Sequence, residues 1–245
     1  MSEEQAKSRD EDHWAKPVSE LHVGHDLPSD AVNLNVEGRR VGGLGGGFGK
    51  MWQKTYRIAL AGATVTPQEV IRAWKEHFPE FWPKGAKFFG PMASVTPGDV
   101  ALLNMKMPGG VKLSTGILVL YADDESFSFI TPEGHMFNSM ITFSARTVDG
   151  RTVAQVQAML RASDPLYEVA MAMGGHRKED KHWKHTLVSL ARHFGVEAKP
   201  EMEKILVDKR RQWKHFGNIR RSAALRSGMY AMGAPFRALA KPFKR

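Results

Sequence analysis

The sequence contains no cysteine, which excludes disulfide bonds and thiolate metal sites. It also lacks any apolar run that approaches the roughly 18 residues of a membrane-spanning helix. The first residues are acidic and carry no apolar segment of a secretory signal, so we expect a cytoplasmic protein. With 245 residues and 42% hydrophobic content, the chain can nevertheless form a core of useful size.

Acidic residues are missing from one end of the chain. Residues 209–245 contain eleven Lys and Arg and no Asp or Glu, whereas residues 1–30 carry a net charge of −5. The overall charge of +9 therefore comes from the C-terminal segment. A basic segment of this kind favours an anionic partner, either a membrane surface or nucleic acid.

Glycines gather at residues 42–49, but their spacing excludes the common phosphate-binding motifs. A phosphate loop needs glycine where Leu44 stands and Ser or Thr where Met51 stands. We therefore interpret the glycine run as a flexible loop or a close approach of backbones. Residues 1–30 are charged and show no sustained period. Together these features predict a flexible N-terminal segment over residues 1–49.

The hydrophobic period predicts a strand, a helix, six strands and a final helix. Residues 55–60 predict the first strand. Thr66, Pro67 and Glu69 then predict a capping box that opens a helix ending near residue 78. The period changes to two after residue 88, and short turns separate the strands, which makes sequential strands antiparallel neighbours. The six strands are predicted at residues 88–95, 99–107, 111–121, 126–130, 136–146 and 152–161.

The final helix carries the apolar stripe that such a sheet needs. A helix begins at Asp164, is interrupted by glycines, and resumes at residue 179. Trp183, Leu187, Leu190 and Phe194 then follow at spacings of 4, 3 and 4. The order predicts an α+β fold in which seven antiparallel strands wrap around one long C-terminal helix, with the domain at residues 50–198.

This order of elements resembles the START/polyketide-cyclase (SRPBCC, helix-grip) superfamily over residues 50–198. The stretch Phe127-Ser-Phe-Ile-Thr-Pro-Glu-Gly-His135 also looks like a motif of an uncharacterised bacterial and plant family of that general shape. Thr131, Gly134 and His135 match the motif, whereas the acidic residues that follow it in the family are replaced here. The resemblance implies a cavity between the sheet and the last helix that holds lipids, sterols, polyketides or other apolar molecules. Some superfamily members are cyclases or hydrolases, and many only bind.

Methionines and a few polar side chains are the predicted lining of such a cavity. Methionine adapts its shape and suits apolar binding surfaces, although ordinary core filling explains the same pattern. We expect the methionines to lie on the concave side of the sheet and the polar groups to face the ligand. The predicted ligand-binding residues are Met105, Tyr121, Met136, Met140, Met159, Arg161, Tyr167 and Leu187.

Catalytic and metal-binding groups are sparse. Glu133 and His135 lie near one turn and are the predicted acid and base of an enzyme, although they are equally suited to a surface turn. Three histidines on the last helix, His182, His185 and His193, are predicted to face solvent because they lie away from the apolar stripe. No acidic side chain completes a zinc site, and we expect neither a metal nor a cofactor.

The basic tail, residues 199–245, shows apolar residues at helical spacing between its basic residues. This pattern is typical of an interfacial membrane helix in two short pieces, because a continuous helix through Pro235 is disfavoured. Packing on the protein's own domain and nucleic-acid binding remain alternatives. The predicted membrane-binding residues are Arg210, Arg211, Trp213, Lys214, Phe216, Arg220, Arg221, Met229, Phe236 and Phe243.

We therefore expect a protein that binds an apolar molecule or lipid and associates peripherally with an anionic membrane, at the inner face of the cytoplasmic membrane. A cyclase/aromatase- or hydrolase-type enzyme that uses the same cavity is the first alternative. A nucleic-acid-associated protein acting through the tail is the second. The sequence leaves the ligand and the oligomeric state open.

Overall fold

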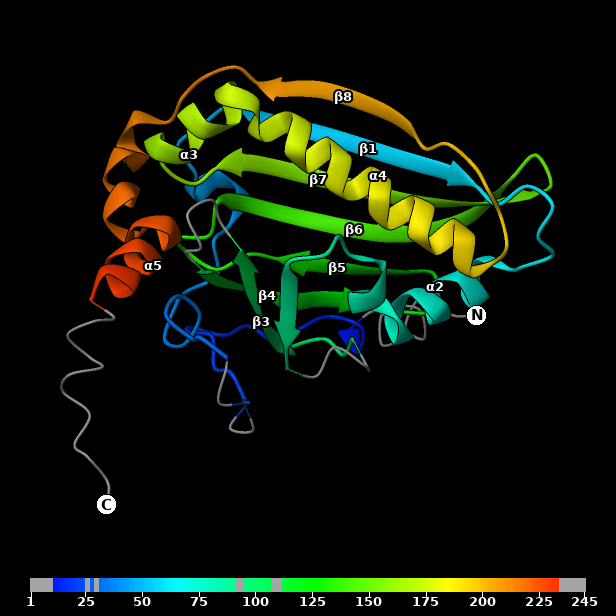
Figure 1. Ribbon diagram of the computed structural model, residues 1–245, viewed down its shortest axis with the longest axis horizontal. Helices are drawn as coiled ribbons and strands as arrows, with labels where there is room; N and C mark the ends of the chain where they lie inside the picture. Colours follow the sequence, from blue (N-terminus) through cyan, green and yellow to red (C-terminus); the bar gives the residue numbers. More distant parts are fainter. Residues whose placement is uncertain (1–10, 25–26, 29–30, 91–94, 107–111, 234–245) are drawn as a thin grey trace.

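The computed structural model describes residues 11–24, 27–28, 31–90, 95–106 and 112–233. One antiparallel sheet of eight strands, in the order β2-β3-β4-β5-β6-β7-β1-β8, curves around the long helix α4 (Figure 1). The α+β helix-grip fold is thereby confirmed. The strands are β1 (Met51–Ala59), β2 (Ala86–Phe89), β3 (Val100–Lys106), β4 (Lys112–Ala122), β5 (Ser126–Ile130), β6 (Phe137–Val148), β7 (Arg151–Ala162) and β8 (Glu201–Asp208).

Short helices close the ends of the sheet. The capping box predicted for α2 is present, since the Thr66 hydroxyl accepts from the Glu69 amide and the Glu69 carboxylate accepts from the Thr66 amide. Three 3₁₀ helices, one π-helical turn and four α-helices complete the described part of the chain. They are η1 (Leu44–Gly46), α2 (Pro67–Glu76), η2 (Phe78–Phe81), α3 (Pro165–Ala170), the π-helical turn η4 (Met171–Gly175), α4 (His176–His193), η5 (Trp213–Arg221) and α5 (Ala223–Met232).

Strand register decides which side chains face α4. In β7 every second residue, from Ala154 through Val156 and Ala158 to Leu160, is buried on the concave face. The same face of α4 buries Trp183 and Leu187 against it, as the helical spacing predicts. The opposite, convex face of β3 and β4 is covered instead by the N-terminal segment, in a second core cluster around Leu21, Val23 and Val36.

The glycine run is a close-packing segment. The Phe48 and Gly49 amides both donate to the Ala162 carbonyl at 2.9 Å, at the end of β7. A side chain at Gly49 would meet the Ala162 methyl at 2.8 Å and would collide with the Glu168 carboxylate. Close packing therefore explains Gly42, Gly46, Gly47 and Gly49, whereas Gly43 and Gly45 have open space around them.

The sheet has eight strands and not seven. Residues 201–208, which the sequence pattern places in the tail, form β8 and pair with β1 from Met51 to Arg57. The segment lacks clear alternation, because Ile205, Leu206 and Val207 are consecutive, so periodicity gave no signal for it. The predicted boundaries at residues 49 and 198 stay predictions, although hydrogen bonds cross both of them.

Candidate ligand-binding site

The space between the concave face and α4 has two unlike halves. In the packed half, beside α2, aromatic rings fill the space completely. Phe143 stacks on Phe127 at 4.7 Å between ring centroids and meets Trp74 at 5.2 Å and Trp183 at 5.7 Å. All four side chains are buried, so this half is a closed core.

The accessible half lies under η4 and the first turns of α4. Ile141 stands in the inner strand β6 on the concave face, between the fully buried Ala158 of β7 and Phe129 of β5. It keeps part of its surface accessible, as do Phe137 on the same strand and Trp52 on β1. An inner strand under a covering helix normally loses such exposure, so the packing above these apolar side chains is incomplete.

Two hydroxyl groups without hydrogen-bond partners lie on the same concave face. Ser139 is opposite Leu160 in the β6–β7 register, and Thr115 is opposite Leu103 in the β3–β4 register. Both residues are at most 1% exposed, and neither Ser139 Oγ nor Thr115 Oγ1 has a hydrogen-bond partner among the described residues. A buried hydroxyl left unpaired costs about 1–3 kcal/mol, which a ligand oxygen or water would relieve.

A buried ionic cluster joins β1 to the start of α4. Lys54 is fully buried, and its Nζ lies 2.7 Å from both a Glu179 and an Asp180 carboxylate oxygen. The Tyr56 hydroxyl donates to the same Asp180 oxygen at 2.8 Å. Lys204 on β8 lies 4.1 Å from the centre of the Trp52 ring beside this cluster. The cluster therefore anchors α4 on the strand edge of the accessible half.

Burial and hydrogen bonding act differently on the two carboxyl groups of the cluster. Burial raises the pKa of Glu179, and the charge of Lys54 only partly opposes it. Burial also acts to raise the pKa of Asp180, but hydrogen bonds from Lys54 and Tyr56 outweigh it, so this pKa is lowered. Asp180 is thus the carboxylate that neutralises Lys54, and Glu179 is the one that takes up a proton more readily.

The predicted ligand-binding residues do not gather at one place. Leu187 belongs to α4 and is fully buried against the sheet, and Met105 lies on the concave face of β3 at the far side of the sheet. Met136 is partly buried just before β6. Tyr167, on α3, accepts a hydrogen bond from the Ala224 amide at 3.0 Å, and burial raises its pKa to about 12. Its hydroxyl therefore secures the C-terminal segment.

The expectation that all the methionines lie on the concave side is wrong. Met140 pairs with Met159 in the β6–β7 register, on the face opposite to Ile141 and Ala158. The alternation of β7 already required this, because Ala158 and Leu160 face the core. Arg161 points to the same convex side and donates to the Gly49 carbonyl at 2.6 Å and to Asp208 at 2.9 Å.

Tyr121 is also engaged outside the concave face. Its hydroxyl donates to the Asp123 carboxylate at 2.5 Å, and its ring packs on Trp14 of the N-terminal segment at 4.8 Å. In the β4–β5 register it stands opposite Ser128, whereas the next residue, Ala122, stands opposite the core residue Phe127. Tyr121 therefore joins the N-terminal segment to the sheet.

His135 and Glu133 occupy separate environments. His135 Nδ1 accepts from the Phe137 amide at 3.0 Å, and burial lowers the pKa of His135 to about 4. The imidazole is therefore neutral at pH 7 and holds the turn into β6. Glu133 lies 3.1 Å from Arg221 and 3.4 Å from Arg40 instead. Their predicted acid–base roles stay predictions.

The solvated face predicted for His182 is wrong. Its ring lies 4.3 Å from that of Trp82, edge to face, and burial lowers its pKa to about 4. The helical angle placed His182 away from the stripe, but the chain after η2 covers that side of α4. His185 and His193 are exposed, as predicted. Among the described residues, no three His, Asp or Glu side chains form a group able to hold a metal ion.

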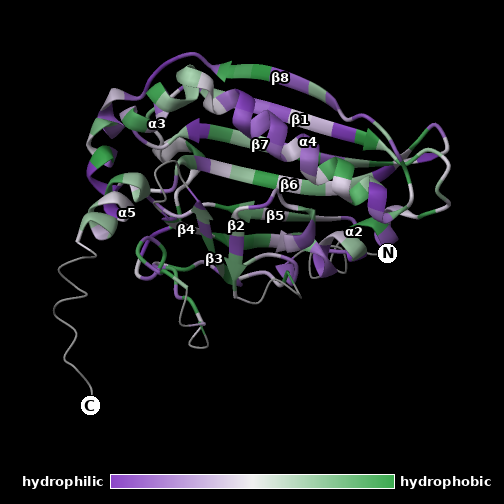
Figure 2. Ribbon diagram, in the orientation of Figure 1, coloured by the Kyte–Doolittle hydropathy of each residue, from purple (hydrophilic) through white to green (hydrophobic). Residues whose placement is uncertain are grey.

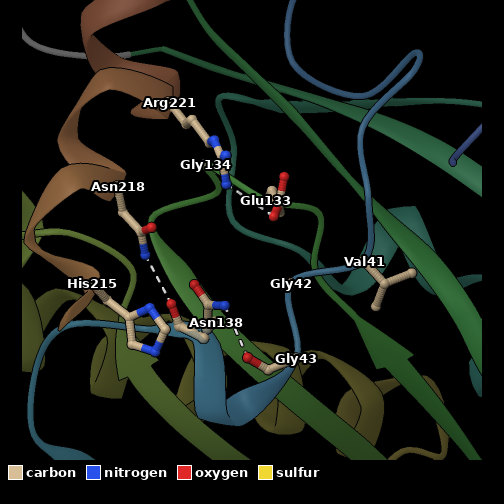
Figure 3. A pocket seen from close by; sticks show the side chains of 10 residues that line it. Val41, Gly42, Gly43, Glu133, Gly134, Asn138, His215, Asn218 and Arg221 are labelled. Carbon is tan, nitrogen blue, oxygen red and sulfur yellow. Dashed lines mark hydrogen bonds and ion pairs between the residues drawn. The ribbon is translucent and has the colours of Figure 1, made fainter. Parts of the chain in front are cut away.

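A separate polar pocket of about 200 Å³ lies where the glycine run meets η5 (Figure 3). Asn138 donates to the Gly43 carbonyl at 2.9 Å, and Asn218 donates to the Gly46 carbonyl at 2.8 Å. Arg221 and Glu133 form an ion pair at its rim. Most polar groups around this pocket already have partners, so it holds the C-terminal segment in place and offers no activated nucleophile.

The basic segment after residue 208 is part of the fold as far as it is described. The Gln212 amide donates to the Phe48 carbonyl at 2.7 Å, and the Ala223 amide donates to the Gly134 carbonyl at 2.8 Å. The helices η5 and α5 meet at Ser222, and α5 ends at Met232. Pro235 lies outside the described residues, so the helix break predicted there stays a prediction. Phe236 and Phe243 lie outside the described residues. No helix of the described residues is both long and apolar enough to cross a membrane.

Several of the predicted membrane-binding side chains have local partners or lie exposed. Arg210 pairs with Asp208, Arg211 with Glu168, and Arg221 with Glu133. Lys214, Arg220, Trp213, Phe216 and Met229 are exposed. The exposed set thus combines large apolar and basic side chains on η5 and α5.

Solved structures match part of this chain at low identity and low TM-score. Protein NE0264 from Nitrosomonas europaea is 16% identical, with 57% of this chain and 92% of that chain covered and a TM-score of 0.39. The di-domain aromatase/cyclase StfQ of the steffimycin biosynthetic pathway is 12% identical, with 60% and 53% covered and a TM-score of 0.44. Major latex-like protein 151 from Panax ginseng is 11% identical, with 60% and 99% covered and a TM-score of 0.37.

The identities and scores of these structures are too low to indicate a ligand or an activity. No family model matches the chain, and no curated protein sequence matches it. The function therefore has to be argued from the residues of this chain.

Alternation along residues 136–146 places Ile141 on one face with Phe137 and Phe143, but the sequence pattern did not single out the other residues of the accessible half: Ser139, Thr115, Lys54 and Glu179. Lys54 carried a signal, because a lysine between Trp52 and Tyr56 interrupts the apolar positions of one strand face. The others look like ordinary strand or helix residues, and only the register brings them under α4.

Proposed function

We propose that the protein binds an apolar small molecule between the concave face of the sheet and α4, in the accessible half. The observation that carries the proposal is the partial exposure of Ile141, in an inner strand beside fully buried neighbours. Phe137 and Trp52 offer further apolar surface there. A ligand of matching shape would cover this surface, and each Å² removed from water contributes about 25 cal/mol.

A blocking substitution tests this proposal. We expect Ile141→Trp to fill the space and to weaken binding of the probe 1-anilinonaphthalene-8-sulfonate at least tenfold, measured by fluorescence titration. Met140→Trp is the matched control, because the neighbouring residue faces the convex side. Native mass spectrometry of the purified protein would show whether a small molecule is retained. Equal binding by the parent protein and Ile141→Trp would contradict the proposed position.

We also propose that η5 and α5 dock on an anionic membrane surface. In α5 the small side chains Ala223 and Ser227 are buried against the protein, whereas Leu225, Met229 and Met232 are exposed. Packing on the protein's own domain therefore leaves the apolar stripe uncovered, which favours the membrane over the self-packing alternative. Met229 keeps 60% of its surface exposed and Trp213 keeps 68%.

The charge around these side chains suits anionic lipid. Trp213 stacks on Phe216 at 6.2 Å with an interplanar angle of 14°, and the exposed Lys214 and Arg220 belong to the same helix, η5. Aromatic residues at an interface combine apolar contact with polar edges. Each Lys or Arg near an anionic leaflet contributes about 1 kcal/mol. Nucleic-acid binding needs the charge but gives no role to the exposed rings.

Vesicle flotation tests the docking proposal. We expect the full chain to float with phosphatidylcholine vesicles that contain phosphatidylserine and not with phosphatidylcholine alone. Trp213→Ser combined with Phe216→Ser should abolish flotation, whereas Trp14→Ser, at an exposed tryptophan elsewhere, should not. Absence of flotation by the parent protein would refute membrane docking. Salt-sensitive DNA binding unaffected by the double substitution would support the nucleic-acid alternative.

A further inference from the structure

The polar pocket beside the glycine run has one wall built by a single face of η5. Because η5 is a 3₁₀ helix, side chains three positions apart lie directly above one another. His215, Asn218 and Arg221 follow at this spacing, and all three line the pocket. Trp213 and Phe216 follow at the same spacing on another face and are exposed. Hydrophilic and hydrophobic residues accordingly alternate along η5 in Figure 2. The pocket is therefore separate from the proposed membrane-docking face.

The opposite wall consists of backbone and one buried amide. The Gly42 amide donates to the Thr131 carbonyl at 2.7 Å, which fixes this part of the glycine run. Asn138, on the convex face of β6, is only 4% exposed, and its Nδ2 donates to the Gly43 carbonyl. Because a carbonyl oxygen can only accept, the amide nitrogen must lie on that side. The Asn138 oxygen is the other arm of the amide group and lies away from Gly43 (Figure 3).

Hydrogen-bonding capacity remains in both walls. His215 Nε2 is buried and has no hydrogen-bond partner among the described residues. Asn218 Nδ2 donates to the Gly46 and Ser163 carbonyls, both at 2.8 Å, so its oxygen is left to accept a further hydrogen bond, as is that of Asn138. A buried polar group without a partner lowers stability unless a bound molecule supplies one. The walls therefore favour a ligand with several hydrogen-bonding groups.

The charges of the pocket restrict the class of this ligand. Arg221 and Glu133 line the pocket and pair at 3.1 Å, and Arg40 lies 3.4 Å from the same Glu133 oxygen. An anion would meet the Glu133 carboxylate and the amide oxygens, whereas a cation would meet the two guanidinium groups. A hydroxyl group avoids both repulsions, because it is neutral and can donate to an oxygen and accept from a nitrogen.

We propose that this pocket binds a small neutral molecule with several hydroxyl groups, such as a monosaccharide or a polyol. Its volume of about 200 Å³ lies below the roughly 300–1,000 Å³ of sites for drug-sized molecules, which limits the size of the ligand. Hydroxyl groups would donate to the oxygens of Asn138 and Asn218 and bond to His215 Nε2. A free sugar and the sugar head group of a neutral glycolipid share this chemistry. The proposal is independent of the apolar site and of membrane docking, because neither of them rests on these residues.

A side chain at Gly43 tests the position of this site. Gly43 lines the pocket, its φ of −59° suits any residue, and nothing lies within 4 Å of an added Cβ. We therefore expect Gly43→Leu to fold and to lower the affinity for galactose, glycerol and myo-inositol at least tenfold. Gly45→Leu is the matched control, since Gly45 also has open space but does not line the pocket. Chemical-shift titration of the full chain by NMR, which follows the side-chain signals of Asn138, Asn218 and His215, measures each affinity.

Circular dichroism melting curves would show that each variant is folded. If Gly43→Leu unfolds, His215→Phe replaces it as the test, because it keeps a ring, removes the buried nitrogen and should weaken binding several-fold. Flotation with phosphatidylcholine vesicles that contain a galactolipid, without shifts by free galactose, would identify the head group as the source of the sugar. Gly43→Leu should abolish that flotation.

The absence of both shifts and flotation overturns the proposal. Inorganic phosphate and methylammonium should cause no shifts, and tighter binding of either one than of the three neutral compounds would overturn the neutral class. Equal affinity of the parent protein and a folded Gly43→Leu variant would overturn the position of the site.

Discussion

The packed and accessible halves of the space under α4 belong to the same fold but differ in how completely side chains fill them. In the packed half, Phe143 of the sheet stacks on Phe127 and meets Trp183 of the helix, and all three side chains are buried. In the accessible half the sheet presents smaller residues, Ala158 and Ser139, beneath a π-helical turn. The comparison shows that a helix lying over a sheet does not by itself fill the space between them. The size of the facing side chains determines whether that space is filled.

Truncation of one core residue in each half is the sharpest test of this comparison. We expect Phe143→Ala to lower the free energy of unfolding by about 3–5 kcal/mol, because the ring contacts buried neighbours on every side. Ile141→Ala should cost less, about 1–2 kcal/mol, because part of its surface is already accessible. Urea denaturation of both variants measures the difference. Equal losses would mean that both halves are equally packed.

We also expect a large loss of stability when the ionic cluster at the edge of the accessible half is disrupted. Lys54→Met should lower the free energy of unfolding by about 3–5 kcal/mol, because it leaves the Asp180 charge beside Glu179 without its cation. Adding Glu179→Gln and Asp180→Asn to Lys54→Met should recover much of that loss. Thermal and urea unfolding measure the free energy of unfolding of the single and triple variants. If the triple variant is no more stable than the single one, unpaired charge is not the cause.

Acid should destabilise the protein through its buried histidines. Burial lowers the pKa of His182, in the packed half, and of His135 to about 4, whereas the unfolded value is about 6.5. The unfolded chain therefore binds protons first as pH falls from 6.5 to 4, and stability is lost over this window. The loss is up to about 3 kcal/mol for one fully buried histidine.

Unfolding by urea at several pH values measures this dependence. His182→Phe should reduce the slope between pH 6.5 and 4, whereas replacement of the exposed His185 should change it less. A slope that is unaffected by His182→Phe would show that the ring is solvated.

The smallest effect concerns the hydroxyl groups. Ser139→Ala should leave the free energy of unfolding unchanged or raise it slightly, because Ser139 Oγ is buried and has no partner. Ser128→Ala is the control, since the Ser128 hydroxyl is 2.8 Å from that of Thr142 on the convex side, and its loss should cost about 1 kcal/mol. A clear destabilisation by Ser139→Ala would point to a bound water or ligand at this hydroxyl.

Local signals predicted most of the fold. The capping box at Thr66 and the strand at residues 126–130 occur where the sequence places them, because each depends on neighbouring residues alone. β8 was missed because its pairing with β1 lies about 150 residues away in the chain, and its apolar residues are consecutive. Neither long-range strand pairing nor a run of consecutive apolar residues produces a period of two in the sequence.

The candidate site was less predictable for the same reason. Met159 was placed on the wrong face although the alternation around Ala158 carried the correct answer. Alternation placed Ile141 on one face with Phe137 and Phe143, but it gave no sign that Ile141 stays accessible, because that depends on what η4 and α4 leave uncovered above it. Ser139 gave no signal at all. Such gaps arise from packing between distant elements, which composition and spacing do not encode.

The position of β1 between β7 and β8, two strands that are synthesised later, has a consequence for folding during synthesis. β1 is synthesised first among the strands, yet its neighbour β7 begins at Arg151 and β8 only at Glu201. At about 5–20 residues per second, roughly 5–20 s pass before β7 is complete. Throughout that interval Trp52, Tyr56 and Ile58 lack the strand that later pairs with theirs. The nascent chain therefore presents this apolar strand to chaperones well before the sheet closes.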